Sequence, residues 1–129
     1  MKNNSVSKIF VIDNCENTQQ LFINYFAGKA DVISAYNLPY ALKILGREEG
    51  LSLIVYNSNL ADSQSEAINF IKAIHAQFPG LIVGLSASSN ENYRSELSLA
   101  GCFIVTEANI APALALTLLC LKLGHSLRV

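Results

Sequence analysis

The chain has 129 residues, of which 51% are hydrophobic and 15% are charged, and its formal net charge is −1. This length predicts one domain, over residues 1–129, that buries enough surface to fold without disulfides or a structural metal. Three cysteines without Cys-x-x-Cys spacing exclude a zinc or disulfide framework. Scattered lysines and arginines argue against direct nucleic-acid binding, and no apolar run approaches the ~20 residues of a membrane span. We therefore expect a soluble, cytoplasmic protein.

The predicted elements begin with a nearly continuous apolar strand at 8–13, a pattern typical of a strand covered on both faces. A polar turn leads into a helix over 18–27, with Gly28 as its stop. Its apolar residues at helical spacing are Leu21, Phe22, Tyr25 and Phe26. A short strand is expected at 31–35.

The next helix is predicted to begin at a cap on Asn37, with Pro39 in its first turn, and to close at Gly50. Its predicted stripe is Leu38, Ala41, Leu42 and Leu45. A third strand at 51–56 and a polar loop at 57–65 follow.

The second half of the chain repeats this alternation. A helix ends at Pro79-Gly80, a strand follows at 81–85, and the loop 86–90 opens another helix that ends at Gly101. The inward residues of these two helices are predicted to be Ala67, Ile71, Ile74, Phe78, Tyr93, Leu97 and Ala100. A strand at 102–105 and a helix at 108–123 are predicted to follow. The predicted core of the domain is therefore residues 8–123.

Five strand–helix repeats with right-handed crossovers predict an α/β fold with a doubly wound, five-stranded parallel sheet. It is flavodoxin-like, with strand order 2-1-3-4-5. In such sheets the functional crevice lies beyond the carboxyl ends of the strands. The turns to examine are therefore 13–17, 57–59, 86–88 and 106–109.

Four short motifs adjoin the predicted strands: KIFVIDN at 8–14, SLIVYN at 52–57, LSA at 85–87 and AGC at 100–102. Together they resemble the receiver domain of bacterial two-component response regulators, and the resemblance covers residues 8–121. It implies that Asp13 keeps one acid of the acidic pair, with Asn14 in place of the second. It also implies that Asn57 stands at the phosphoacceptor aspartate and Ser86 at the hydroxyl position. The lysine position falls on Thr106, Glu107 or Ala108, of which Glu107 is favoured.

The resemblance therefore implies a degenerate phosphorylation pocket, made of Asp13, Asn14, Asn57, Ser86 and Glu107. The neutral amide of Asn57 cannot form the acyl phosphate. Asp13 with two amides makes a weak Mg²⁺ site, and a carboxylate from Glu107 repels a phosphoryl group. We expect an atypical pseudo-receiver that acts in signal transduction by phosphorylation-independent protein–protein interaction. It is expected not to be an enzyme and to have no catalytic residue, metal or cofactor. On its own, Ser86 is more often a turn or cap residue.

The last helix is apolar nearly all round. Its predicted sheet-facing stripe is Ile110, Leu114, Thr117, Leu118 and Leu121. A second stripe of Leu116, Leu119 and Leu123 is predicted to contact a protein partner or a second copy in a homodimer. The resemblance supports this, since receivers commonly dimerise or dock partners on the surface of their fourth helix, fifth strand and fifth helix. A C-terminal output domain outside this chain is a further expected partner.

Two alternative functions remain open. The first is a small-ligand-binding or redox-responsive domain that uses the crevice around Asp13, Cys15, Asn57 and Glu107. A helix N-terminus lowers the pKa of a nearby thiol, although the neighbouring carboxylates of Asp13 and Glu16 oppose a thiolate at Cys15. The second alternative is a receiver phosphorylated on Asp13.

The remaining cysteines and histidines have less specific interpretations. Cys102 and Cys120 lie in apolar patterns typical of packing, and His75 and His125 are predicted to lie on the surface.

Overall fold

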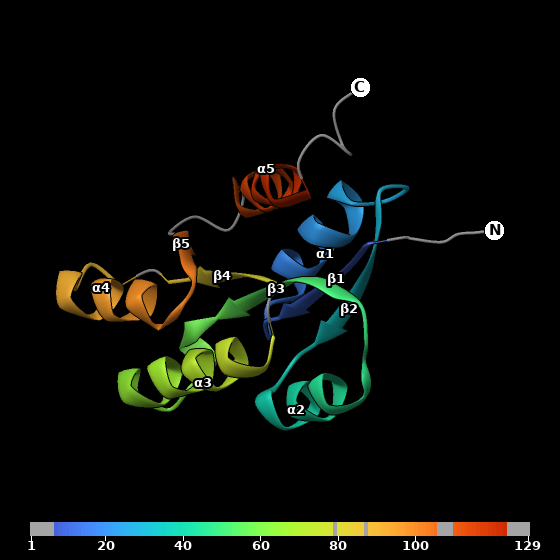
Figure 1. Cartoon of the computed structure of the whole chain (residues 1–129). Coiled ribbons are helices and arrows are strands. Elements are labelled where there is room, and N and C mark those ends of the chain that lie inside the picture. The colour runs from blue at the N-terminus through green and yellow to red at the C-terminus, as the bar shows by residue number, and fades with distance from the viewer. Residues whose placement is uncertain (1–6, 79, 87, 106–109, 124–129) are drawn as a thin grey trace.

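The computed structural model describes residues 7–78, 80–86, 88–105 and 110–123. Strands and helices alternate along the chain (Figure 1). In order, the elements are β1 (Ser7–Ile12), α1 (Glu16–Tyr25), β2 (Ala30–Ala35), α2 (Leu38–Arg47), β3 (Leu51–Asn57), the 3₁₀ turn η1 (Ser58–Leu60), α3 (Gln64–Gln77), β4 (Leu81–Leu85), α4 (Glu91–Ala100), β5 (Phe103–Val105) and α5 (Ala111–Leu123).

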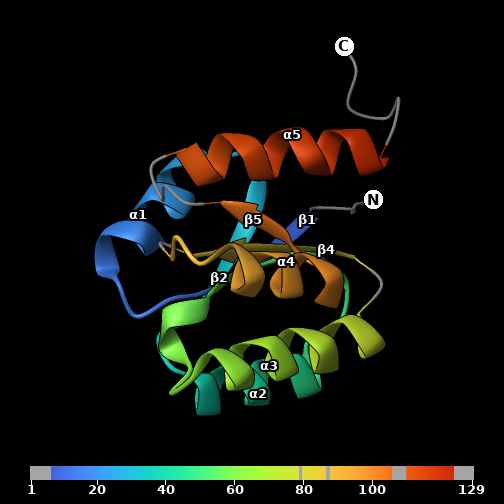
Figure 2. The ribbon, with the colours of Figure 1, turned by 90° about the vertical axis from the view of Figure 1, so that its left-hand side faces the viewer.

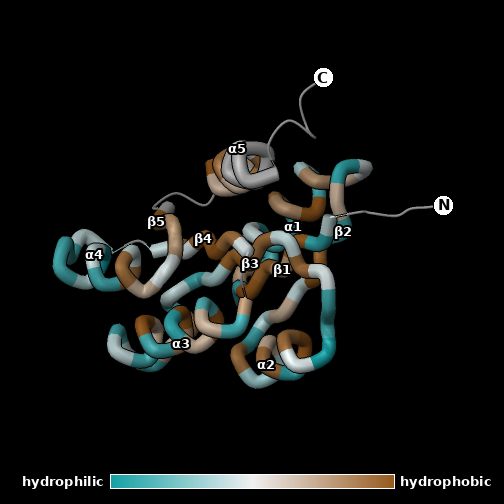
Figure 3. The backbone as a smooth tube through the Cα atoms, in the orientation of Figure 1, coloured by the Kyte–Doolittle hydropathy of each residue, from teal (hydrophilic) through white to brown (hydrophobic). Residues whose placement is uncertain are grey.

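The strands form one parallel five-stranded sheet with the order β2-β1-β3-β4-β5, which confirms the predicted topology. Helices α1 and α5 cover one face of the sheet, and α2, α3 and α4 cover the other (Figures 1 and 2). The central strands are therefore buried on both sides, which explains their continuous apolar sequences (Figure 3). None of the described helices is both long enough and apolar enough to cross a membrane.

Side-chain caps define the starts of α2, α3 and α4. The side chain of Asn37 accepts a hydrogen bond from the Tyr40 N–H, as the predicted cap requires. Ser63 and Asn90 cap α3 and α4 in the same way.

The predicted inward residues of α3 and α4 are confirmed as buried or half-buried: Ala67, Ile71, Ile74, Phe78, Tyr93, Leu97 and Ala100.

The predicted inward faces of α1 and α2 are wrong in part. Helix α1 begins at Glu16, before the predicted start, and buries Thr18 and Gln19 in its first turns. Leu21 and Tyr25 are 38% and 37% exposed. The polar Gln19 lies inside because backbone carbonyls at the strand ends accept its amide N–H groups. In α2, Leu42 is 58% exposed, beside a cavity rather than against the core.

The predicted sheet-facing stripe of α5 is wrong in part, since Leu114 is half-buried and packs against the core as predicted, but other members do not. Ala111 and Ala115 are fully buried, whereas Ile110 is 51% exposed and Thr117 is exposed. Small side chains at this spacing allow close approach of the helix to the sheet. Leu116, predicted to face a partner, is half-buried and packs against the core beside α1.

Gly101 ends α4 in a conformation that only glycine adopts readily, with φ +122°. A Cβ at this position would lie 2.6 Å from Cγ of His75, an exposed residue of α3 as predicted. We expect Gly101→Ala to lower the free energy of unfolding by about 2–3 kcal/mol, from backbone strain and displacement of the imidazole.

Urea unfolding checks this prediction, with Gly50→Ala as the matched control. Gly50 also has a positive φ (+78°), but its Cβ would meet nothing within 4 Å. Its substitution therefore carries backbone strain alone, about 1 kcal/mol. Equal losses in the two variants would contradict the packing of Gly101 under His75.

Candidate functional site

Three of the predicted pocket residues follow neighbouring strands at the carboxyl edge of the sheet. Ile12 at the end of β1 is paired in register with Tyr56, and Asn57 at the end of β3 is paired with Leu85. Asp13, Asn57 and Ser86 therefore lie along one edge, as the sequence predicts. Asn14 is exposed.

Asp13 is the buried acid of this edge, with only 1% of its surface exposed. Its Oδ1 accepts two hydrogen bonds, from the Cys15 N–H at 2.9 Å and from Nδ2 of Asn57 at 3.1 Å. Its Oδ2 is buried and has no hydrogen-bond partner in the described part of the chain. Both N–H donors bring positive partial charge to the carboxylate, which offsets part of the cost of burying it.

The orientation of the Asn57 amide is fixed by its other end. Its Oδ1 accepts a hydrogen bond from the Asn59 N–H at 2.9 Å, so the NH₂ group faces Asp13. Mg²⁺, the metal that receiver pockets hold, requires oxygen ligands. Here the Asn57 oxygen turns away from Asp13 and an N–H donor faces the carboxylate. This donor set does not fit Mg²⁺, and among the described residues no three His, Cys, Asp or Glu side chains come together as metal ligands.

Ser86 lies directly after β4, and its surface is 3% exposed. Its Oγ accepts a hydrogen bond from the Ser88 N–H at 3.4 Å, which is the geometry of a serine turn. The neighbouring Ser58 is also buried and donates its hydroxyl proton to the Leu85 carbonyl at 3.1 Å. Both hydroxyls thus shape loops at this edge.

Gln19 anchors α1 beneath the same edge, although the sequence patterns did not single it out. Its Nε2 lies 3.0 Å from the carbonyl oxygens of both Val11 and Asp13, and 3.2 Å from that of Ala35. One fully buried amide therefore joins the ends of β1 and β2 to the first helix. This anchor fixes the backbone that carries Asp13.

Tyr56 precedes Asn57 and points to the opposite side of β3. It is fully buried, its ring centroid lies 4.6 Å from that of Phe70 in α3, and its hydroxyl has no partner among the described residues. Burial raises the pKa of this phenol well above its ordinary value. This tilted ring pair gives β3 a contact with α3 next to Asn57.

The cysteines differ in exposure and acidity. Cys15 is exposed at the N-cap of α1, and hydrogen bonds with Thr18 lower the pKa of its thiol. Cys102 is buried, as predicted, and burial raises its pKa to about 12. The predicted residue Glu107 lies outside the described residues, as do Thr106, Ala108 and the side chains of Leu119, Cys120 and Leu123.

Comparison with solved structures shows which proteins share this fold. A two-component response regulator from Clostridium difficile superposes with a TM-score of 0.76 at 17% identity, over 92% of this chain and 98% of that one. A response regulator from Thermotoga maritima gives 0.72 at 20% identity, over 88% and 98%. A CheY-like receiver domain protein from Methanospirillum hungatei gives 0.72 at 15%, over 93% and 100%. No family model and no curated protein sequence matches the chain. The chain therefore has the fold of response regulator receiver domains.

Proposed function

We propose that this chain is a receiver-like signalling module of the two-component type that works by protein–protein contact without accepting a phosphoryl group. The observation that carries this proposal is the hydrogen bond from Nδ2 of Asn57 to Oδ1 of Asp13. In a phosphorylated receiver the strand-three position supplies a carboxylate nucleophile. Here it supplies a poorly nucleophilic amide that holds the remaining acid in place.

The same hydrogen bond removes the usual reason for a metal in such a pocket. A cation offsets the repulsion between clustered carboxylates, but here the second charge is absent and an N–H group faces the first. The single carboxylate of the pocket is therefore held by hydrogen bonds from neutral N–H donors. Any switching must come from a partner that binds one conformation more tightly than another.

The proposed contact surface lies on α4, β5 and α5. Leu99 of α4 is 86% exposed and Phe103 of β5 is 49% exposed. A groove between α4 and β5 is lined by Leu99 and Ile104 together with the polar residues Glu91, Arg94, Ser95 and Ser98. Large exposed apolar side chains gathered at a sheet edge favour a protein partner, either another protein or a second copy. Leu119 and Leu123 of the predicted leucine stripe are proposed to extend this surface onto α5, without Leu116, which packs against the core.

An NMR titration with Mg²⁺ and beryllofluoride, a phosphoryl mimic, tests the proposal. The wild-type chain is expected to show no saturable shifts of the Asp13, Asn57 and Ser86 amides, because neither the donor set nor the nucleophile fits. Saturable shifts at sub-millimolar concentration, spreading from Asp13 to β5, would overturn it.

Incubation with acetyl phosphate serves as the second arm. Phosphate incorporation that disappears in Asp13→Ala would instead establish Asp13 as the acceptor. Intact mass measurement of both proteins distinguishes these outcomes.

A further inference from the structure

Helices α2 and α3 lie side by side on one face of the sheet but leave a cavity of about 490 Å³ between them (Figures 1 and 2). Neighbouring helices on a sheet ordinarily close such a gap with interlocking side chains. The main helix contact of α3 is with α4, on its other side. The cavity lies toward the amino ends of the strands, where Leu51 begins β3, and so away from the Asp13 pocket.

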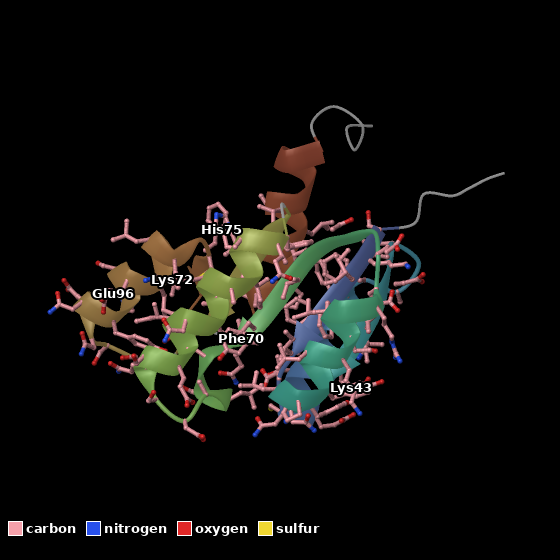
Figure 4. All side chains as sticks on the ribbon, turned by 60° about the horizontal axis from the view of Figure 1, so that its bottom comes forward. Lys43, Phe70, Lys72, His75 and Glu96 are labelled. Atoms are coloured by element: carbon pink, nitrogen blue, oxygen red, sulfur yellow. The ribbon has the colours of Figure 1, made fainter. Side chains whose placement is uncertain are left out.

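The walls of the cavity are mostly apolar and come from regular stripes on both helices. Leu42 and Leu45 line the cavity from α2. Phe70 and Ala73 line it from α3, and Phe78 lines it from the position directly after α3. Figure 4 shows Phe70 on the side of α3 that is turned toward α2. Cavities of a few hundred Å³ with apolar walls are the usual form of small-molecule sites in proteins.

Gly46 lies at an open part of the cavity wall. It lies in the last turn of α2 and lines the cavity, and a Cβ built on it would meet nothing within 4 Å. Its φ lies outside the positive region, so the backbone does not require glycine. Glycine weakens a helix relative to alanine, and here no close packing compensates for that cost. The open space beside Gly46 is therefore part of the cavity wall that α2 provides.

The polar rim of the cavity favours a hydrogen-bond donor. Both helices run toward this end, so their last carbonyl groups place the negative pole of each helix dipole here. Among the residues that line the cavity, Glu48 is the charged one, and Gln77 adds an amide. Nζ of Lys8 lies 3.3 Å from Oε1 of Glu48 and pairs with its charge, so the preference of the rim for a donor comes from the carbonyl groups at the helix ends. The rim is complementary to an amine or hydroxyl group.

We infer that the α2–α3 cavity binds a small, mainly apolar molecule with a hydrogen-bond-donating or cationic end. Phe70, which lines one wall of the cavity, packs against the ring of Tyr56, the residue before Asn57. The site thus adjoins the strand that carries the pocket without sharing a residue with it. The inference goes beyond the proposed function and does not rest on it.

The first experiment uses N-phenyl-1-naphthylamine, an uncharged probe with two aromatic groups, one N–H donor and fluorescence that rises in apolar surroundings. We expect saturable one-to-one binding to the wild-type chain. The double variant Gly46→Leu with Ala73→Leu fills the cavity from both walls, and binding should weaken by about tenfold or more.

A control variant outside the cavity locates the binding. Leu99→Ser removes the most exposed apolar side chain of the α4 surface and should leave the affinity for the probe unchanged. Binding that survives the filled cavity, or that is lost in Leu99→Ser, would overturn the inference.

A competition on the wild-type chain identifies the preferred end group without any variant. Decylamine and decanoate share one chain length and carry opposite charges, and both are used below their micelle concentrations. Decylamine should displace the probe at a concentration about tenfold lower than decanoate. Equal displacement, or better displacement by decanoate, would refute the donor preference. None of these results alters the beryllofluoride test of the pocket.

Discussion

Gln19→Leu is expected to lower the free energy of unfolding by about 2–4 kcal/mol. The substitution keeps the apolar stem but removes the amide that three carbonyl oxygens share, those of Val11, Asp13 and Ala35. The Ala35 carbonyl still accepts a hydrogen bond from the Asp13 N–H. The other carbonyls lose a buried donor, and β1 and β2 lose their link to α1. Urea unfolding followed by circular dichroism measures this loss.

Gln20→Leu is the matched control for this prediction. Gln20 is the next residue of the same helix, but it is exposed, and its amide reaches only the side chain of Glu16. Its substitution should change stability by no more than about 0.5 kcal/mol. If the two leucine variants lost the same free energy of unfolding, the buried amide of Gln19 would contribute no more to stability than the exposed amide of Gln20.

Asn57→Asp is expected to destabilise the chain by about 2–3 kcal/mol at pH 7.5 without divalent cations. The change replaces an N–H donor with an oxygen anion at the 3.1 Å contact with Asp13, a residue that is 1% exposed. Repulsion raises the pKa of one carboxyl of the pair above its unfolded value. The protonated form is then favoured in the folded state, so stability is retained at low pH and lost as the pH rises above about 4.

Three measurements separate this charge effect from simple loss of a hydrogen bond. The destabilisation of Asn57→Asp should be smaller at pH 5 than at pH 7.5, and that of Asn57→Ala, which adds no second carboxylate, should change less between the two pH values. Mg²⁺ at about ten times its dissociation constant should restore roughly 1.4 kcal/mol to Asn57→Asp, because it binds the folded pair. The wild-type chain should gain nothing from Mg²⁺. An Asn57→Asp protein that is as stable as the wild type at pH 7.5 would contradict the contact with Asp13.

The strand pattern of the sequence predicts most of the fold because a doubly covered parallel sheet requires continuous apolar strands. The run at 51–56 is one such strand, and the structure extends it only to Asn57. The cap at Asn37 was predictable because its side chain acts within one turn of chain. Leu42 was mispredicted because helical spacing alone does not show that α3 stands away from α2 at this point.

The candidate site was predictable to a smaller extent. Asp13 and Asn57 are adjacent because parallel strands bring their carboxyl ends together, which follows from topology alone. Gln19 was missed because a lone glutamine in a helix is ordinarily a surface residue, and its acceptors lie outside its own helix, at the ends of β1 and β2. Ala111 and Ala115 were missed because leucines dominate that helix, while close approach to the sheet selects small side chains.

The strand order has a consequence for how the chain folds. The first strand to be synthesised, β1, lies between β2 and β3 rather than at an edge. Its pairing with β2 forms early, but its other side stays open until residue 57 has been made. An unpaired edge of a largely apolar strand favours association with other chains. The middle of the sheet can therefore close only after the first 57 residues have been made.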